Sequence, residues 1–288
     1  MRQTPATELR FHEEVLALAR SGETEHYLAA LLAPPAERAA LLAIAAFSAD
    51  LDRITTSARD PLVGEIRLQW WRDALPEIAG GSLTGNPIAD QLGAAVRRYD
   101  LPSPLFGAMI DGHAATLYPD PLPDRRAFES HLSQLRGPLF ASALRVLACP
   151  GEHLVRLCEP AGRISGLARL ACRLPRLVAA EHLYLPDAYL AEAGIGREQL
   201  IVASDAAAPR RIVDCIRREI AELRAAVEPQ IAVLSRHQRI ALLPLATVPL
   251  QTQIAGRQAA AGFREVHEMP ALGRITRIWL AHWSLIRI

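Results

Sequence analysis

Lysine is missing from this sequence of 288 residues, and all 32 of its basic residues are arginine. The absence excludes mechanisms that use a lysine Schiff base or the lysine of a nucleotide-binding phosphate loop. Aromatic residues are also scarce, at 5%, and 31 acidic residues reduce the formal net charge to +1. Because the chain has neither a basic excess nor many stacking side chains, we expect no nucleic acid partner.

Cysteine and long apolar runs are scarce as well. Cys149, Cys158, Cys172 and Cys215 form no C-x-x-C pair, and the histidines show no zinc-binding spacing with them. We expect the cysteines to be small core residues in a reducing compartment. The sequence contains no apolar run of about 18 residues, and its N-terminus lacks the apolar core of a signal peptide. These features predict a cytoplasmic protein that is soluble or at most peripheral to a membrane.

Segments of helical period, separated by proline and glycine, fill the chain and predict an all-α fold. No linker-like composition divides it, so residues 1–288 are expected to form a single domain. An N-terminal helix in residues 1–22 either joins the core or lies at its periphery, and Gly137-Pro138 is expected to kink or break a helix. The predicted helices cover 8–20, 25–32, 35–55, 61–78, 87–99, 103–117, 124–149, 151–174, 209–227, 229–239, 242–261 and 269–286.

The helix predicted after Asp60 begins with a good capping pair, an aspartate followed by Pro61. Leu62, Ile66 and Trp70 then recur every four residues, and Trp71 belongs to a second apolar row. Aromatic residues at helical spacing usually pack inside, so we expect both tryptophans in the core. His113, on a later helix, is expected to be exposed.

The C-terminal amphipathic helix, residues 268–288, carries arginines beside apolar residues and tryptophan. Such a helix either lies at a membrane interface or packs on the core of its own protein. We favour packing on the core.

Four segments carry a resemblance to a known family: residues 27–34, 46–56, 61–75 and Tyr184-Leu185-Pro186. Together they resemble the squalene/phytoene synthases, which are head-to-head prenyl transferases. The resemblance implies the isoprenoid synthase fold, a single helical domain around a central cavity. It also implies two aspartate-rich motifs that face each other and hold the magnesium ions that bind the substrate diphosphate.

Most of the aspartates that the resemblance implies are absent. The first motif falls on Asp52, Arg53 and Thr56, and the second on Arg173 and Leu177. Five negative charges become one negative and two positive charges. Magnesium in a diphosphate site is held by carboxylates together with phosphate oxygens. We therefore expect no cofactor and no catalysis, and magnesium only if the chain is an active prenyl transferase after all.

Arg53 and Arg173 have two interpretations. They either bind an anion directly, since guanidinium groups fit phosphate and carboxylate, or they are structural, one of them pairing with Asp52 across the former cavity. We favour the structural interpretation. The resemblance adds Arg72, Asp111, Arg169 and Tyr184 as candidate ligand or cavity residues.

The segment Gly64–Arg72 is similar to a signature of the family branch that includes mitochondrial assembly factors for respiratory complex I. This resemblance implies an inactive relative that binds a protein partner, such as subunits of complex I, at the inner membrane face of a bacterium. One alternative is an active prenyl transferase on farnesyl or geranylgeranyl diphosphate. Another is a metal-free binder of an isoprenoid or phospholipid that uses Arg53, Arg72 or Arg173.

Overall fold

The computed structural model describes residues 5–58, 60–202 and 204–288, with side chains from residue 13 onward. All regular structure in these ranges is helical. The helices are α1 (Pro5–Gly22), α2 (Thr24–Ala30), α3 (Pro35–Ser57), α4 (Pro61–Ala79), α5 (Pro87–Tyr99), α6 (Ser103–Ala115), α7 (Arg125–Val146), α8 (Gly151–Ala179), α9 (Asp187–Glu192), α10 (Arg197–Ile201), α11 (Ala208–Ala232), α12 (Arg236–Arg239), the 3-10 helix η1 (Ile240–Thr247), α13 (Val248–Ala260) and α14 (Ala271–His282).

Local capping chemistry explains where several helices begin. The Asp60 carboxylate accepts a hydrogen bond from the Leu62 amide at 2.9 Å, and Pro61 occupies the first helical position. Asn86 caps α5 in the same way, and Asp124 caps α7. A side-chain acceptor satisfies an amide that has no partner within the helix, so each of these residues fixes a helix start.

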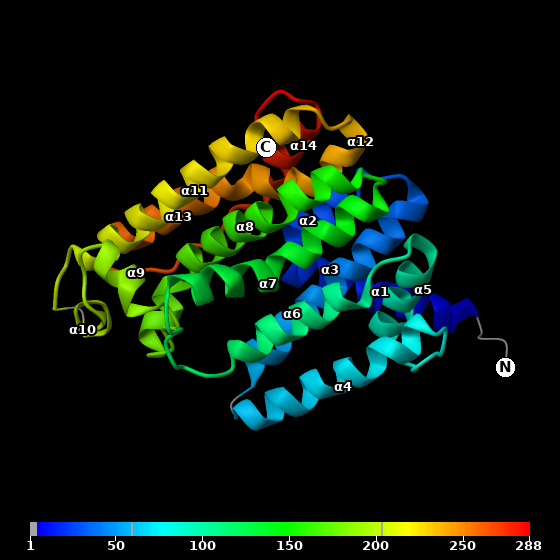
Figure 1. Cartoon of the computed structure of the whole chain (residues 1–288), viewed down its shortest axis with the longest axis horizontal. Helices are drawn as coiled ribbons and strands as arrows, with labels where there is room; N and C mark the ends of the chain where they lie inside the picture. Colours follow the sequence, from blue (N-terminus) through cyan, green and yellow to red (C-terminus); the bar gives the residue numbers. More distant parts are fainter. Residues whose placement is uncertain (1–4, 59, 203) are drawn as a thin grey trace.

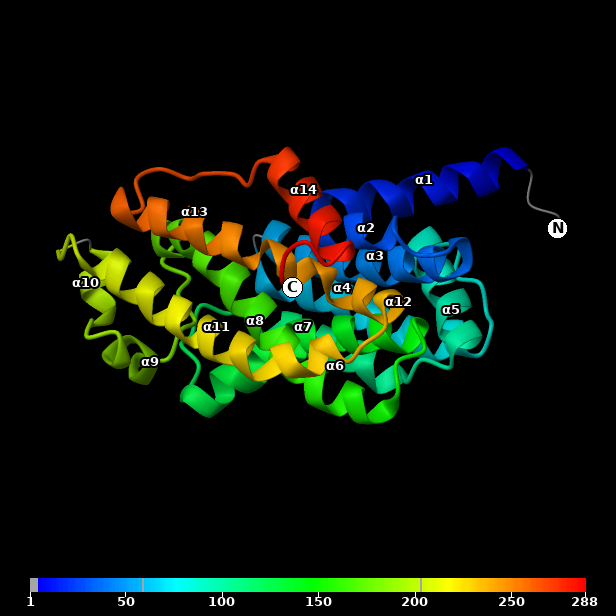
Figure 2. The same cartoon turned by 90° about the horizontal axis from the view of Figure 1, so that it is seen from above.

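Two long helices, α7 and α8, pack extensively against each other in the middle of the bundle. Helices α11 and α13 pack on α8, whereas α3 and α6 pack on α7. Figure 1 shows α4 along the lower edge and α14 at the upper edge, and Figure 2 shows α1 extending to the side that carries the N-terminus. The region between α3 and α8 therefore lies inside the bundle.

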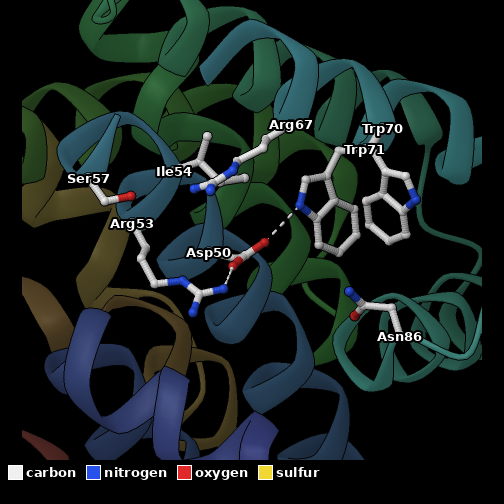
Figure 3. A pocket seen from close by; sticks show the side chains of 8 residues that line it. All are labelled: Asp50, Arg53, Ile54, Ser57, Arg67, Trp70, Trp71 and Asn86. Carbon is white, nitrogen blue, oxygen red and sulfur yellow. Dashed lines mark hydrogen bonds and ion pairs between the residues drawn. The ribbon is translucent and has the colours of Figure 1, made fainter. Parts of the chain in front are cut away.

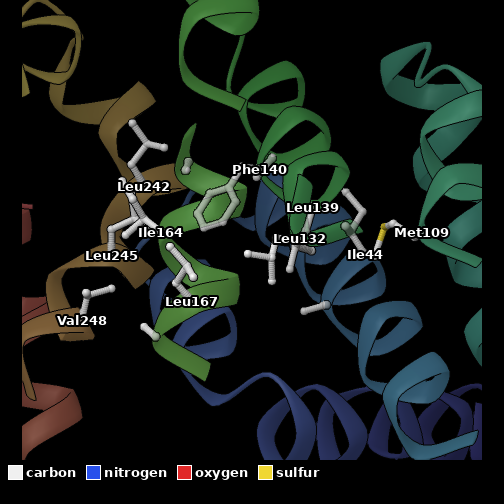
Figure 4. Close-up of a cluster of buried hydrophobic side chains, with 14 of the residues drawn as sticks. Ile44, Met109, Leu132, Leu139, Phe140, Ile164, Leu167, Leu242, Leu245 and Val248 are labelled. Carbon is white, nitrogen blue, oxygen red and sulfur yellow. The ribbon is translucent and has the colours of Figure 1, made fainter. Parts of the chain in front are cut away.

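Figure 4 shows buried apolar side chains from α3, α6, α7, α8, η1 and α13 meeting in one cluster. Close helix contact contributes to this packing: a Cβ added to Gly162 on α8 would lie 2.4 Å from the backbone nitrogen of Gly137 on α7. Every residue of η1 is buried. A small cavity of about 20 Å³, lined by His26 and apolar side chains, lies between α2, α3, α7 and η1.

The structure confirms the all-α prediction but changes several helix boundaries. Helix α7 runs through Pro138 without a break, and α11 runs through Pro229, where the sequence predicted two helices. The helix predicted over 242–261 is a 3-10 segment followed by α13. Helices α9 and α10 were not predicted, because six and five residues are too few to show a period.

Two predictions about burial were wrong. Trp71 is buried, but Trp70 is 41% exposed, and Leu62 and Ile66 of the same row are exposed too, because α4 lies at the edge of the bundle. His113 is buried rather than exposed, since α6 turns it toward the interior.

The two terminal helices differ in how they dock. Val15 and Ala19 of α1 are buried, and this helix packs on α3. Helix α14 packs on η1 and α2 with Ile278 and Ala281, as the favoured alternative predicted, but its opposite side is exposed. Over the described ranges, the helices are all too short or too polar to cross a membrane.

Candidate functional site between helices α3 and α8

Asp52 on α3 faces α8, where the second aspartate motif of the family is expected. Both of its carboxylate oxygens accept hydrogen bonds from Arg173, at 2.8 and 2.5 Å. Arg169, one helical turn earlier on α8, approaches the same carboxylate at 3.3 Å. The arginine at a position of the second motif thus forms the ion pair with Asp52 that the sequence predicted.

A second carboxylate lies deeper in the bundle, at the junction of α1 and α2. Glu23 is fully buried, and both of its oxygens accept from the guanidinium group of Arg136 on α7, one of them at 2.8 Å. The Ser48 hydroxyl of α3 donates to it at 2.9 Å. Arg169 lies 3.5 Å from Glu23 and joins this pair to Asp52.

These residues form one network, which we call the interior ion network: Glu23, Ser48, Asp52, Arg136, Arg169 and Arg173. It carries two negative and three positive charges and connects the junction of α1 and α2 to α3, α7 and α8. Buried charges are tolerated when they are paired and hydrogen-bonded. The network therefore occupies with paired side chains the position at which the family resemblance implies a metal site.

The ionisation of the network follows from these contacts. Burial alone would raise the pKa of Glu23, but the attraction of Arg136 and Arg169 outweighs it and holds the pKa well below the usual range. For Asp52 the attraction of Arg169 and Arg173 likewise overcomes burial and strongly lowers the pKa. Both carboxylates are ionised at neutral pH, and their charge is already compensated.

Buried ionisable side chains surround the network, among them His26, whose Nδ1 lies 3.2 Å from Glu23. Burial lowers the pKa of His113 to about 4, although Asp52 and a hydrogen bond to the Met109 carbonyl act in the opposite direction. Burial and the nearby His113 lower the pKa of His131 to about 4 as well. The ring of Tyr184 packs edge-on against His131, and burial raises its pKa to about 12. His113, His131 and Tyr184 are therefore neutral at neutral pH.

The other motif positions do not join the network. Arg53 points to a different side of α3, where it pairs with Asp50 at 2.6 Å and is 65% exposed. The Thr56 hydroxyl donates to the backbone carbonyl of Asp52 at 2.7 Å. Leu177 packs against the apolar core. Arg173 and Arg53 thus have separate roles, although the sequence considered them together.

Arg72 and Asp111 form a pair of their own. The Arg72 guanidinium donates to the Asp111 carboxylate at 2.8 Å and connects α4 to α6. The two side chains are 37% and 63% exposed, so water screens the interaction. This pair lies at the surface of the bundle and is distinct from the interior ion network.

A groove of about 530 Å³ lies between α3 and α4. Figure 3 shows Arg53 and Arg67 reaching into it, with the indole rings of Trp70 and Trp71 beside them. The Trp71 ring nitrogen donates to Asp50 at 2.9 Å, which satisfies the buried indole. Among the described residues Arg67 has no ion-pair partner, so the groove has an available positive charge next to an exposed aromatic ring.

The residues between α3 and α8 do not fit a magnesium site. Hard cations need several oxygen ligands, whereas Asp52 and Glu23 are each held by arginine. Throughout the described ranges no group of three or more histidine, cysteine, aspartate or glutamate residues is arranged to hold a metal ion.

Sequence reasoning missed Glu23, Ser48, Arg136 and the burial of His113. Arg136 alone had a visible signal, as a charge within the apolar stretch from Leu132 to Leu144. Glu23 lies between two helices and belongs to no periodic pattern. Its partner is more than 100 residues away in the chain, so only the tertiary fold brings them together.

The squalene/phytoene synthase family pattern matches residues 19–287. The chain belongs to this family. The matched region covers almost the whole chain, including both the interior ion network and the groove.

The relatives that this chain resembles include both an assembly factor and an enzyme. Complex I assembly factor 6 from Bos taurus is 24% identical over 186 residues, which cover 65% of this chain and 56% of the relative. This chain therefore spans little more than half the length of that assembly factor. The presqualene diphosphate synthase of Rhodopseudomonas palustris is 24% identical over 255 residues, which cover 88% of this chain and 89% of the enzyme.

Solved structures establish the fold. A squalene synthase from Alicyclobacillus acidocaldarius superposes with a TM-score of 0.74 at 18% identity, covering 89% of this chain and 97% of the enzyme. A dehydrosqualene synthase superposes with a TM-score of 0.79 at 15% identity, covering 96% of this chain and 97% of the enzyme. The protein has the isoprenoid synthase fold, as the resemblance implied.

Proposed function

We propose that this protein is a non-catalytic member of its family that assists the assembly of respiratory complex I by binding its subunits. The observation that carries the proposal is the ion pair of Asp52 with Arg173, which occupies the position of the expected metal site. Ionisation of a diphosphate requires stabilisation of the charge that develops on the leaving group. A carboxylate held by two arginines is poorly placed to bind the metal ions that would supply it.

The similarity to complex I assembly factor 6 supports the choice of partner. We place the protein in the cytoplasm, at the inner face of the membrane into which complex I is inserted. A tagged copy is expected to co-purify with complex I subunits, and deletion of the gene is expected to reduce the amount of assembled complex. Unchanged complex I in the deletion strain would contradict the proposal.

A double variant separates a scaffold from an enzyme. Asp52→Asn with Arg173→Met removes the last carboxylate of the aspartate motifs together with its bidentate partner, and Arg169 keeps its contact with Glu23. If the protein is a scaffold, this variant restores complex I in the deletion strain. A family enzyme that depends on Asp52 would lose its activity, and the variant would then fail to complement.

The purified protein also tests the rival enzymatic function. Incubation with farnesyl or geranylgeranyl diphosphate and magnesium is expected to give no squalene- or phytoene-type product, with the presqualene diphosphate synthase as a positive control. Magnesium-dependent turnover would refute the non-catalytic proposal, whatever the outcome for complex I.

The groove between α3 and α4 favours a second candidate function, metal-free binding of an isoprenoid diphosphate or phospholipid. Arg53 and Arg67 offer guanidinium groups for the anionic head, and exposed Trp70 offers an apolar surface for the chain. All three arginines named from the sequence are paired with a carboxylate, and Arg53, whose partner is Asp50, is the most exposed of them at 65%.

A ligand that binds only the folded state raises its stability, by about 2.7 kcal/mol at a concentration one hundred times Kd. We expect farnesyl diphosphate to raise the melting temperature in the presence of EDTA and Arg67→Gln to remove the effect. Arg72→Gln, on the same helix but outside the groove, is the matched control. If both variants lost the ligand-induced rise in melting temperature equally, the ligand would bind outside the groove.

A further inference from the structure

Helix α14 has one buried side and one exposed apolar side. Ile278 and Ala281 pack on the bundle. On the opposite side Leu272, Ile275, Trp279 and Trp283 form a row with spacings of three and four residues, and each is about half exposed or more. We call this row the α14 apolar face. A row of large apolar side chains left in water is unusual for a soluble protein and points to an interaction surface.

The charged side chains on α14 and after it are all basic. From Met269 to the last residue, Ile288, the sequence contains arginine and histidine but no aspartate or glutamate. Arg274 pairs with Glu25, and Arg287 pairs with Glu228. Arg277, which lies on the flank of α14, has no ion-pair partner among the described residues.

A further arginine reaches the α14 apolar face from another helix. The Arg236 guanidinium of α12 lies 3.5 Å from the centre of the Trp283 ring. This stacking holds a positive charge directly beside an exposed indole. The face therefore combines apolar residues, indole rings and arginines, which are the components of a helix that lies in a membrane interface.

We propose that the α14 apolar face binds the surface of a membrane that contains anionic lipids, with the helix axis parallel to the membrane plane. At 12 residues the helix is about 18 Å long, too short to cross a bilayer. Its indoles and aliphatic side chains would enter the headgroup region, while the arginines contact lipid phosphates. The inference rests on this face alone and is independent of the proposed role in complex I assembly.

The exposed row on α4 provides a contrast within the same chain. Leu62, Ile66 and Trp70 expose a similar apolar surface. The charge on α4 is mixed, because Glu65, Asp73 and Glu77 accompany Arg67 and Arg72, whereas α14 carries no acidic residue. Helix α4 also lies at the edge of the bundle opposite α14, so one membrane plane does not reach both (Figure 1).

Vesicle flotation tests the proposal with the full-length protein. We expect it to float with vesicles of phosphatidylcholine and phosphatidylglycerol, to float less as salt is raised, and to remain in solution with phosphatidylcholine alone. Ile275→Ser with Trp279→Ser should weaken binding at least about tenfold, because both apolar insertion and indole anchoring are lost. Ile66→Ser with Trp70→Ser, the matched change on α4, should bind like the wild type. Circular dichroism confirms that both variants remain folded.

Tryptophan fluorescence gives a second measurement. Vesicle binding should shift the emission of wild type to the blue, and Trp70→Phe should retain the shift, whereas Trp279→Phe with Trp283→Phe should lose it. Failure of the wild type to bind anionic vesicles would overturn the proposal. Equal losses of binding in the α4 and α14 variants would also overturn it, as would an α14 face that binds a protein in solution but no vesicle.

Discussion

Glu23→Gln tests whether the interior ion network is an essential element of the fold. The substitution leaves Arg136, which is only 6% exposed, without its compensating charge. Removal of one partner of a buried pair costs about 3–5 kcal/mol. With an unfolding entropy of about 2.1 cal/mol/K per residue, the 288 residues give a fall in melting temperature of about 5–8 °C. Thermal unfolding followed by circular dichroism measures this change.

Two further variants show whether the loss comes from the unpaired charge. Arg136→Met added to Glu23→Gln removes both partners, and we expect it to recover at least half of the lost stability, since an apolar replacement of a buried pair is often close to neutral. Asp111→Asn breaks the exposed pair with Arg72 and should cost under about 1 kcal/mol. The reasoning is refuted if Glu23→Gln costs no more than Asp111→Asn.

Three other predictions follow from the same structure. Asp52→Asn should destabilise by about 1–2 kcal/mol in urea unfolding, less than Glu23→Gln, because Arg173 is 39% exposed and water can replace its partner. Because the pKa of buried His113 falls to about 4 in the fold from about 6.5 in the unfolded chain, the unfolded state binds more protons and stability falls with pH below 6.5, by about 2 kcal/mol at pH 5. His113→Gln should remove this part of the loss, while the loss from buried His131, whose pKa is also about 4, should remain. Gly162→Ala should cost about 1–3 kcal/mol, because its Cβ would meet backbone atoms of α7, whereas Gly151→Ala, with no atom within 4 Å of its Cβ, should have little effect on thermal unfolding.

The fold was largely predictable from the sequence because its signals are local. Proline and capping residues mark the helix starts, and apolar rows mark the buried sides of α3, α5 and α8. The same reasoning misplaced Trp70, since periodicity shows that a helix has an apolar side but not whether another helix covers it. On α14 it identified an amphipathic helix correctly yet could not show that the tryptophans face away from the core.

The site was predictable only where a motif position marked it. The pairing of Asp52 with Arg173 could be predicted because an arginine stands at an aspartate position of the second motif, facing the aspartate that remains in the first. Glu23 and Arg136 had no such marker, and a buried carboxylate between two helices looks in the sequence like any solvated glutamate. Arg53 was grouped with Arg173 because both replaced motif aspartates, but a helix separates positions 52 and 53 by about 100°, and Arg53 therefore pairs with Asp50.

Arg173 has an ion-pair partner and Arg67 has none among the described residues, and this difference decides where an anion would bind. An anion that approached Arg173 would have to displace the Asp52 carboxylate from a two-point contact and leave that charge partly buried without its partner. Arg67 faces the groove between α3 and α4 and has no ion-pair partner among the described residues, because the carboxylate in the groove, Asp50, pairs with Arg53. Binding there breaks no existing ion pair of Arg67. We therefore expect binding of a free isoprenoid diphosphate to be lost with Arg67→Gln and retained by the double variant Asp52→Asn with Arg173→Met, the reverse of what a family active site between α3 and α8 would give.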